Sequence, residues 1–230
     1  MRVSYHRGGG GRSGVASSEW LSIDGDTFEA WRTVGTSAAG RFAGTLTPHE
    51  TARLTHAVAA CETAEPAHPP VRRPGATTVQ VDIGSTSVTY GRGSPPPGPW
   101  TELDNVLQEL CDAVVDRPTG AIGIEAAGVA TQLVHRGHDP IAVDLSGGTF
   151  VAIAYTGWYH EEARSEGALD GGRVTAAPGW SVPIPVGELP DSDTVSEKVT
   201  VHVTARFTIG EGRDAKQVEI THAPELERPD

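Results

Sequence analysis

The sequence of 230 residues predicts an α+β protein, with an N-terminal antiparallel sheet and two amphipathic helices, followed by a mostly β module. Two segments, starting at Thr47 and Pro99, repeat apolar residues with a helical period. Most other ordered segments alternate apolar and polar residues, as half-buried strands do. The 28 glycines and 17 prolines are typical of many short elements joined by turns. We therefore expect two domains, 1–117 and 118–230, the second a small sandwich or open barrel.

Strands are expected at the start of the first domain. Residues 1–7, MRVSYHR, alternate apolar and polar side chains, and so do 19–23 and 27–34. Asp24-Gly25, between the last two, is a two-residue hairpin signal. The glycine-rich segment 8–14 is expected to be too flexible for regular structure.

The first helix is predicted by its capping residues. Thr47 can cap the helix, Pro48 suits the first helical position and Glu50 completes a capping box. One apolar stripe follows, formed by Leu54, Ala57, Val58 and Cys61. The helix should end near residues 65–66, and the proline-rich residues 66–76 should form an extended connector.

A hairpin and a second helix complete the first domain. Residues 77–83 and 86–91 read as strands around a Gly84-Ser85 turn. The prolines at 95–97 and 99 lead into a helix that Pro118-Thr-Gly120 should end. Its apolar face contains Trp100, Leu103, Val106, Leu107, Leu110 and Val114. Cys61 and Cys111 lie on the apolar sides of the two helices, so we expect buried thiols rather than a disulfide.

The second domain is predicted to be nearly all β. Residues 128–137, 141–146 and 149–155 read as strands. The most regular pattern runs over 197–210, expected to be the longest strand and to pair with 216–222. One face should contain Val199, Val201, Val203, Ala205, Phe207 and Ile209. The segment 157–167 is interpreted as an acidic loop.

Charge and hydropathy exclude several classes of partner. The net charge is −12 and the pI is about 5.1, which argues against nucleic acid or an anionic membrane as partner. No run of 18 apolar residues occurs, and the first residues lack the apolar core of a secretory signal. We therefore expect a cytoplasmic protein.

No catalytic pattern stands out, so we expect a non-enzyme without a cofactor. The tetraglycine, with Arg7 and Arg12 beside it, lacks the G-K-[ST] ending of a phosphate loop, and no G-x-S-x-G elbow occurs. His135, His138 and His160 leave a metal-binding protein as an alternative, although their spacing matches no standard zinc pattern.

The order of elements in the first domain resembles the emfourin family, small protein inhibitors of protealysin-type, thermolysin-like metalloproteases. The resemblance covers about residues 1–117. It rests on MRVSYHRGGG, TFEAWRTV, LTPHETARLTHAV, TTVQVDIGSTSVTYG and PPPGPWTELDNVLQEL. It implies an α+β fold and a protein-binding function, with a metalloprotease as the partner.

Two functions therefore stay open beside the metal-binding alternative. One is inhibition of a thermolysin-like metalloprotease; the other is a non-catalytic accessory subunit of a bacterial protein complex. For either, the expected partner contacts lie in the glycine loop and in the aromatic pair of 157–167, because exposed aromatics anchor interfaces. The pair can equally be a core element. The candidate contact residues are Gly9, Gly10, Arg12, Val15, Trp158 and Tyr159.

Overall fold

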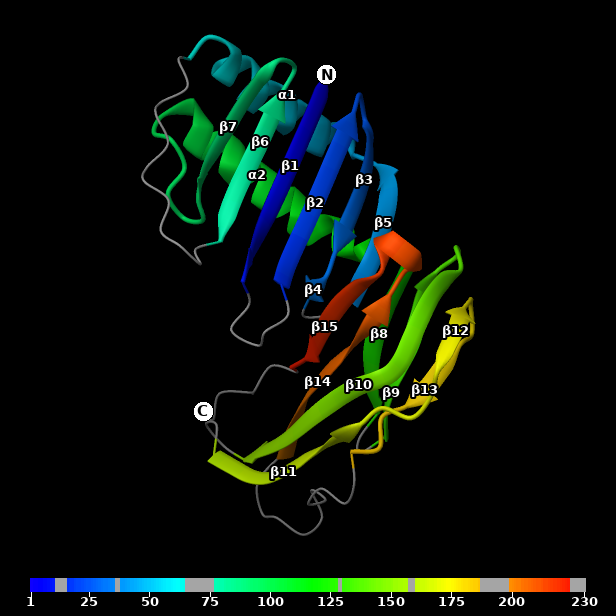
Figure 1. The fold of residues 1–230 in the computed structure, drawn as a ribbon. Helices are drawn as coiled ribbons and strands as arrows, with labels where there is room; N and C mark the ends of the chain where they lie inside the picture. Colours follow the sequence, from blue (N-terminus) through cyan, green and yellow to red (C-terminus); the bar gives the residue numbers. More distant parts are fainter. Residues whose placement is uncertain are drawn as a thin grey trace. The chain divides into compact units, whose positions relative to one another are not determined.

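A computed structural model describes residues 1–10, 16–35, 38–64, 77–127, 130–156, 160–186 and 199–223 (Figure 1). The chain divides into two compact units. The first unit contains residues 1–33 and 41–119, and the second contains 34–40 and 120–230. The domain boundary near residue 117 remains a prediction from the sequence.

The first unit is built on an antiparallel sheet in which β1 is central. Its neighbours are β2 on one side and β6 on the other; β3 and β5 lie beyond β2, and β7 lies beyond β6. The bounds are β1 (Arg2–Gly10), β2 (Ala16–Asp24), β3 (Thr27–Arg32), β5 (Ala38–Thr45), β6 (Thr78–Ile83) and β7 (Thr86–Gly91).

Two helices, α1 (Pro48–Glu62) and α2 (Pro99–Ala113), cover one face of this sheet (Figure 1). The short 3₁₀ helix η1 (Val114–Asp116) follows α2. Alternate strand residues, such as Tyr5 and Leu21, place their side chains on the helix-covered face and are fully buried. Leu54 and Leu103 of the helices are fully buried as well. The period-2 and period-3.6 apolar patterns therefore meet in one core.

Local sequence signals predicted the helices correctly. The Thr47 N–H donates to Glu50 Oε2 at 2.6 Å, and the Glu50 N–H donates to Thr47 Oγ1 at 3.2 Å, which is the expected capping box. The second helix begins at Pro99, and the predicted apolar face from Trp100 to Val114 is buried. Both cysteines are buried free thiols, as predicted.

Three expectations about the strands of the first unit were wrong. Strand β1 continues through Gly10, so Gly8 and Gly9 are paired strand residues rather than part of a flexible loop. The turn between β2 and β3 is Gly25-Asp26, one residue later than expected, because Asp24 pairs with Thr27 and Gly25 takes the positive φ of 66°. Strand β5 was missed because its sequence, AAGRFAGT, has no β-branched residue before Thr45.

The second unit contains strands of two sheets. In one, β13 (Ser181–Pro183), β9 (Ala130–Gly137), β8 (Pro118–Ala127) and the first residues of β5 are successive neighbours. The other has the order β11-β10-β14-β15-β4, and β12 also pairs with β10. Its bounds are β11 (His160–Ala168), β10 (Ile141–Thr156), β14 (Val199–Ile209), β15 (Lys216–His222), β4 (Val34–Gly35) and β12 (Arg173–Ala176).

The pairing of β14 with β15 confirms the predicted hairpin. Its alternating face is buried as expected at Val203, Ala205, Phe207 and Ile209. The longest strand, however, is the 16-residue β10, not the 11-residue β14. The pairing register of β10 shifts between Asp144 and Thr149, around Gly147 with a φ of 74°. Because of this irregularity, the sequence pattern predicted two strands where the structure has one.

Two more segments differ from the sequence interpretation. Residues from His160 onward form strand β11 instead of an acidic loop. The second helical segment ends before Pro118, as expected, but strand β8 begins at this proline and occupies 118–127, which was not predicted from the sequence. No helix in the described ranges is long and apolar enough to cross a membrane.

Candidate functional site: the β1–β2 hairpin

The glycine-rich end of β1 is held in a regular hairpin with β2. Gly8 pairs with Ser18, Gly9 with Ser17 and Gly10 with Ala16. The Ser17 hydroxyl donates to the Gly9 carbonyl at 3.3 Å. On the other side of β1, the Thr78 hydroxyl donates to the Gly8 carbonyl at 3.3 Å. Strand β1 is therefore paired with β2 through Gly10 and with β6 through Gly8.

Thr33 reinforces the β2 side of this hairpin. Its Oγ1 accepts a hydrogen bond from the Ser18 N–H at 2.8 Å and lies 3.1 Å from the carbonyl oxygen of Ala16, to which it donates. Thr33 is 2% exposed, so these bonds are shielded from water. The last residues of the hairpin before its loop are thus held by side chains as well as by strand pairing.

A charged cluster lies at the base of the hairpin, on the helix-covered face of the sheet. Arg7 pairs with Glu19 across β1 and β2, and Glu19 pairs with Arg32 across β2 and β3. Arg32 Nε donates to Glu19 Oε1 at 2.7 Å, and Arg7 forms an ion pair with Glu19 Oε2. Arg32 Nη2 also donates at 3.0 Å to the carbonyl of Cys111, near the end of α2. We call Arg7, Glu19 and Arg32 the hairpin-base cluster.

Two members of the hairpin-base cluster are buried, and Arg7 is half-buried. Glu19 is 6% exposed and Arg32 is 9% exposed. A buried carboxylate shared by two guanidinium groups is tolerated because each of its oxygens faces a cation and Oε1 accepts hydrogen bonds from Arg32. Burial also raises the pKa of the neighbouring Cys111 thiol far above its ordinary value, so this cysteine stays protonated and is no nucleophile.

Sequence reasoning missed the hairpin-base cluster, although a signal for it was present. Glu19 has the same strand parity as the buried Leu21, and Arg32 has the same parity as the buried Ala30. Opposite charges on the apolar parity of adjacent strands indicate a buried ion pair. From the sequence we considered Arg7 only beside the glycines, in relation to a phosphate loop, and gave no role to Glu19 or Arg32.

The structure brings Gly9 and Gly10 together at the end of β1. Gly9 has a packing role: a Cβ at this position would lie 2.7 Å from the Thr77 Cα. Arg12 and Val15 lie in the connection between β1 and β2, outside the described residues. Trp158 and Tyr159 lie in the connection between β10 and β11, in the second unit, and also outside them.

The histidines considered for a metal site are only partly described. His135 Nε2 lies 2.9 Å from the Asp139 carbonyl oxygen, and His138 is exposed beside the Asp139 carboxylate at 3.6 Å. For His160 the structure gives the backbone position in β11. Among the described residues, no three His, Cys, Asp or Glu side chains are grouped so that they could hold a metal ion.

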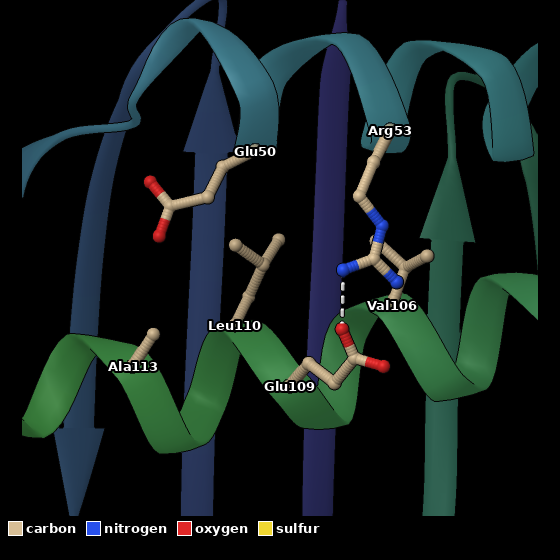
Figure 2. Close-up of a pocket in the computed structure, with 6 residues that line it drawn as sticks. All are labelled: Glu50, Arg53, Val106, Glu109, Leu110 and Ala113. Carbon is tan, nitrogen blue, oxygen red and sulfur yellow. Dashed lines mark hydrogen bonds and ion pairs between the residues drawn. The ribbon is translucent and has the colours of Figure 1, made fainter.

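A shallow groove between α1 and α2 is the other feature of the helical face. Figure 2 shows Arg53 of α1 reaching over to its ion-pair partner Glu109 of α2, beside Val106 and Leu110. The groove has a volume of about 150 Å³, below the roughly 300 Å³ at which ligand pockets begin. Arg53 and Glu109 are bonded to each other, and Glu50 is bonded to Arg117, so the charged groups of the groove converge on no ligand.

Glu50, at the end of this groove, belongs to the capping box at the start of α1. Burial tends to raise its pKa, but the bonds from the Thr47 N–H and from Arg117 outweigh burial and lower the pKa. Arg117 Nη2 donates to Glu50 Oε1 at 2.9 Å. These contacts connect Arg117, which follows η1, to the first turn of α1.

A wider depression of about 540 Å³ lies on the first unit around Ser22, Phe28 and Ala43. The charged pair at its margin, Arg2 and Asp24, is bonded at 2.8 Å and well exposed. Water competes with ligand contacts at such a site. Neither the groove nor this depression is therefore a stronger candidate site than the β1–β2 hairpin.

Comparison with known protein families, with curated proteins and with solved structures finds no match to this chain. The fold itself defines the class: an α+β protein of mostly β structure, in which antiparallel pairing predominates.

Proposed function

We propose that this chain is a protein-binding module that presents the loop of its β1–β2 hairpin to a partner. The observation that supports the proposal most directly is the hairpin-base cluster, which links β1, β2 and β3 beside a strand end of three paired glycines. A binding loop on a fixed base loses less conformational entropy on binding than a free segment does. The proposal needs no catalytic group in the chain itself.

For the partner, we propose a thermolysin-like metalloprotease that the chain inhibits. The support is the resemblance of residues 1–117 to the emfourin family together with a hairpin loop at the end of a held strand. The second unit, expected from the sequence to be a small sandwich or open barrel, is not part of that resemblance. Its role in this proposal is to add contact area beyond the hairpin.

The test replaces the loop while keeping its base. Residues 11–15 are replaced by Asn-Gly, a two-residue turn that can join the paired residues Gly10 and Ala16. The full-length variant and the parent are titrated at micromolar concentration against a recombinant protealysin-like enzyme with a peptide substrate. We expect inhibition by the parent and its loss in the variant, with thermal stability retained.

A matched control replaces the Gly25-Asp26 turn, at the opposite end of β2, by the same Asn-Gly. This control should inhibit like the parent. If the parent leaves the protease fully active, the inhibitor proposal is wrong. Equal inhibition by the loop variant would show that the hairpin loop is not the contact.

The accessory-subunit function remains the alternative. In that case a host protein that is not a protease would bind the parent and fail to bind the loop variant. Metal content of the purified full chain tests the metal-binding alternative based on His135, His138 and His160. A stoichiometric metal that is lost on replacing His135 and His138 would favour that alternative.

A further inference from the structure

Strand β7 is the outer strand of the first unit's sheet, beyond β6 (Figure 1). Its sequence, TSVTYG, contains no charged residue and no proline. Proteins usually protect an edge strand with charges, proline or shortness, because an open edge pairs with other chains. Strand β7 has six residues and none of these protections.

Edges in the second unit are protected. Strand β11 has alternating charges at Glu161, Arg164 and Glu166. Strand β13 is three residues long and ends at Pro183. The lack of protection is thus particular to β7 among these three edge strands.

The hydrogen-bonding pattern identifies which backbone groups of β7 point outward. The Arg92 N–H donates to the Thr77 carbonyl at 2.9 Å, continuing the β6–β7 ladder. In an antiparallel pair such bonds alternate along the strand, so Val88 and Tyr90 also bond to β6. Ser87 and Thr89 then direct their N–H and C=O groups away from the sheet. Within the described part of the chain, no hydrogen bond reaches these groups.

We propose that β7 pairs with β7 of a second copy of this chain, forming a two-fold symmetric antiparallel dimer. Ser87 would pair with Thr89 of the second copy, and Thr89 with its Ser87, so that both copies exchange main-chain hydrogen bonds. Val88 then lies opposite its own equivalent on the two-fold axis. In a two-fold dimer both copies contribute the same surface, so the single edge strand β7 is enough to form the interface.

The chemistry of β7 favours a second copy as the occupant. Ser87 and Thr89 place hydroxyl side chains opposite each other, and Val88 faces Val88, so no like charges oppose each other in the pairing. The chain as a whole carries a net charge of −12, which opposes association over longer distances. Since salt screens this repulsion, the dimer should be tighter at about 0.5 M salt than at about 0.05 M salt.

The first experiment measures the mass of the full chain by analytical ultracentrifugation across a concentration series. A short edge buries little area, so we expect a weak dimer that forms with rising concentration. Thr89→Pro removes the outward N–H and blocks the edge without removing a bond to β6. We expect dimerisation at least about tenfold weaker in Thr89→Pro, because an edge that lacks the central N–H loses its pairing. The matched control Thr89→Val keeps the N–H and should dimerise like the parent.

Circular dichroism and a thermal melt check that each variant is folded. Should Thr89→Pro fail to fold, Ser87→Lys takes its place, because a charge on the edge protects it against pairing. A parent that stays monomeric at millimolar concentration overturns the proposal. So does a dimer that survives the edge variant. Binding of a foreign extended segment at β7 by a monomeric chain is likewise contrary to the proposal.

A second experiment tests the register. On the two-fold axis the two Val88 Cα atoms of a non-hydrogen-bonded pair would be about 4.5 Å apart, within disulfide reach. Val88→Cys should therefore give a disulfide-linked dimer under mild oxidation on a non-reducing gel. The control is Val81→Cys, the direct partner of Val88 on β6, equally buried but not at the edge. Cross-linking of both variants, or of neither, contradicts the proposed register.

Discussion

The first unit places charged side chains on the buried face of its sheet, whereas the inward side chains of β14 in the second unit are apolar. Strand β1 ends in glycines, which have no side chains to distinguish one pairing register from the next. Just before these glycines, Arg7 of β1 lies opposite Glu19 of β2, and Glu19 lies opposite Arg32 of β3. Strand β14 alternates apolar and polar residues along its length, so a one-residue slip would expose its apolar side chains. The difference teaches that the glycine end of a strand, where no side chain specifies the register, can be supported by an ion pair beside it, while the apolar pattern of Val3 and Tyr5 specifies the rest.

The largest expected effect comes from placing a charge in the apolar strand. Val203 is fully buried, and Val203→Asp would leave an unpaired carboxylate in the core. We expect it to cost more than about 4 kcal/mol and to unfold the second unit. The control Thr204→Asp puts the same charge on the other face of β14 and should cost much less. Chemical denaturation followed by circular dichroism measures both, and similar costs would mean that the two faces are equally exposed.

Removing the carboxylate of the hairpin-base cluster should have the next largest effect. Glu19→Ala leaves the buried Arg32 with only the distant, exposed carboxylate of Asp112 at 3.7 Å, so we expect a loss of about 3–5 kcal/mol. The double replacement Glu19→Met with Arg32→Met removes both buried charges and should be less destabilised than Glu19→Ala. Urea unfolding of the three proteins tests this. A loss below about 1 kcal/mol in Glu19→Ala is what a surface ion pair would give, and would disprove the role of the cluster.

A smaller effect is expected where the glycine strand meets its neighbour. A Cβ at Gly9 would lie 2.7 Å from the Thr77 Cα, so Gly9→Ala forces backbone movement and should cost about 1–3 kcal/mol. At Gly8 the nearest atom belongs to the movable ring of His6, at 3.1 Å, and Gly8→Ala should cost less. Thermal unfolding compares the two variants, and an equal or reversed order would contradict the close approach at Gly9.

The smallest effect is a pH dependence in the second unit. Burial, with a further contribution from nearby His222, lowers the pKa of His202 below its ordinary value of 6.5. The unfolded chain therefore binds more protons than the folded chain below about pH 6.5, and the free energy of unfolding falls as the pH drops through this range. Denaturant midpoints at a series of pH values from neutral to mildly acidic should show the decline. The decline should be weaker in His202→Gln; the same pH dependence in that variant would assign it to other groups.

The sequence by itself determined the elements with strong local signals. The capping box at Thr47, the apolar stripe of α2 and the turn at Gly84-Ser85 act within a few residues, so they were readable without any tertiary information. The alternation in β14 likewise predicted its buried face and its pairing with β15. Two candidate contact residues, Gly9 and Gly10, are placed together on β1, but as paired strand residues rather than in a loop.

The tertiary structure alone decided the elements that lack such signals. Strand β5 consists largely of small residues, and the glycines at 147–148 interrupt the pattern of β10, so their extended conformation depends on neighbouring strands. The hairpin-base cluster also depends on long-range pairing, because Arg7 and Arg32 are 25 positions apart and meet only through Glu19 on the strand between them. A strand's side-chain pattern is local, but its partners and its register are set by the whole sheet.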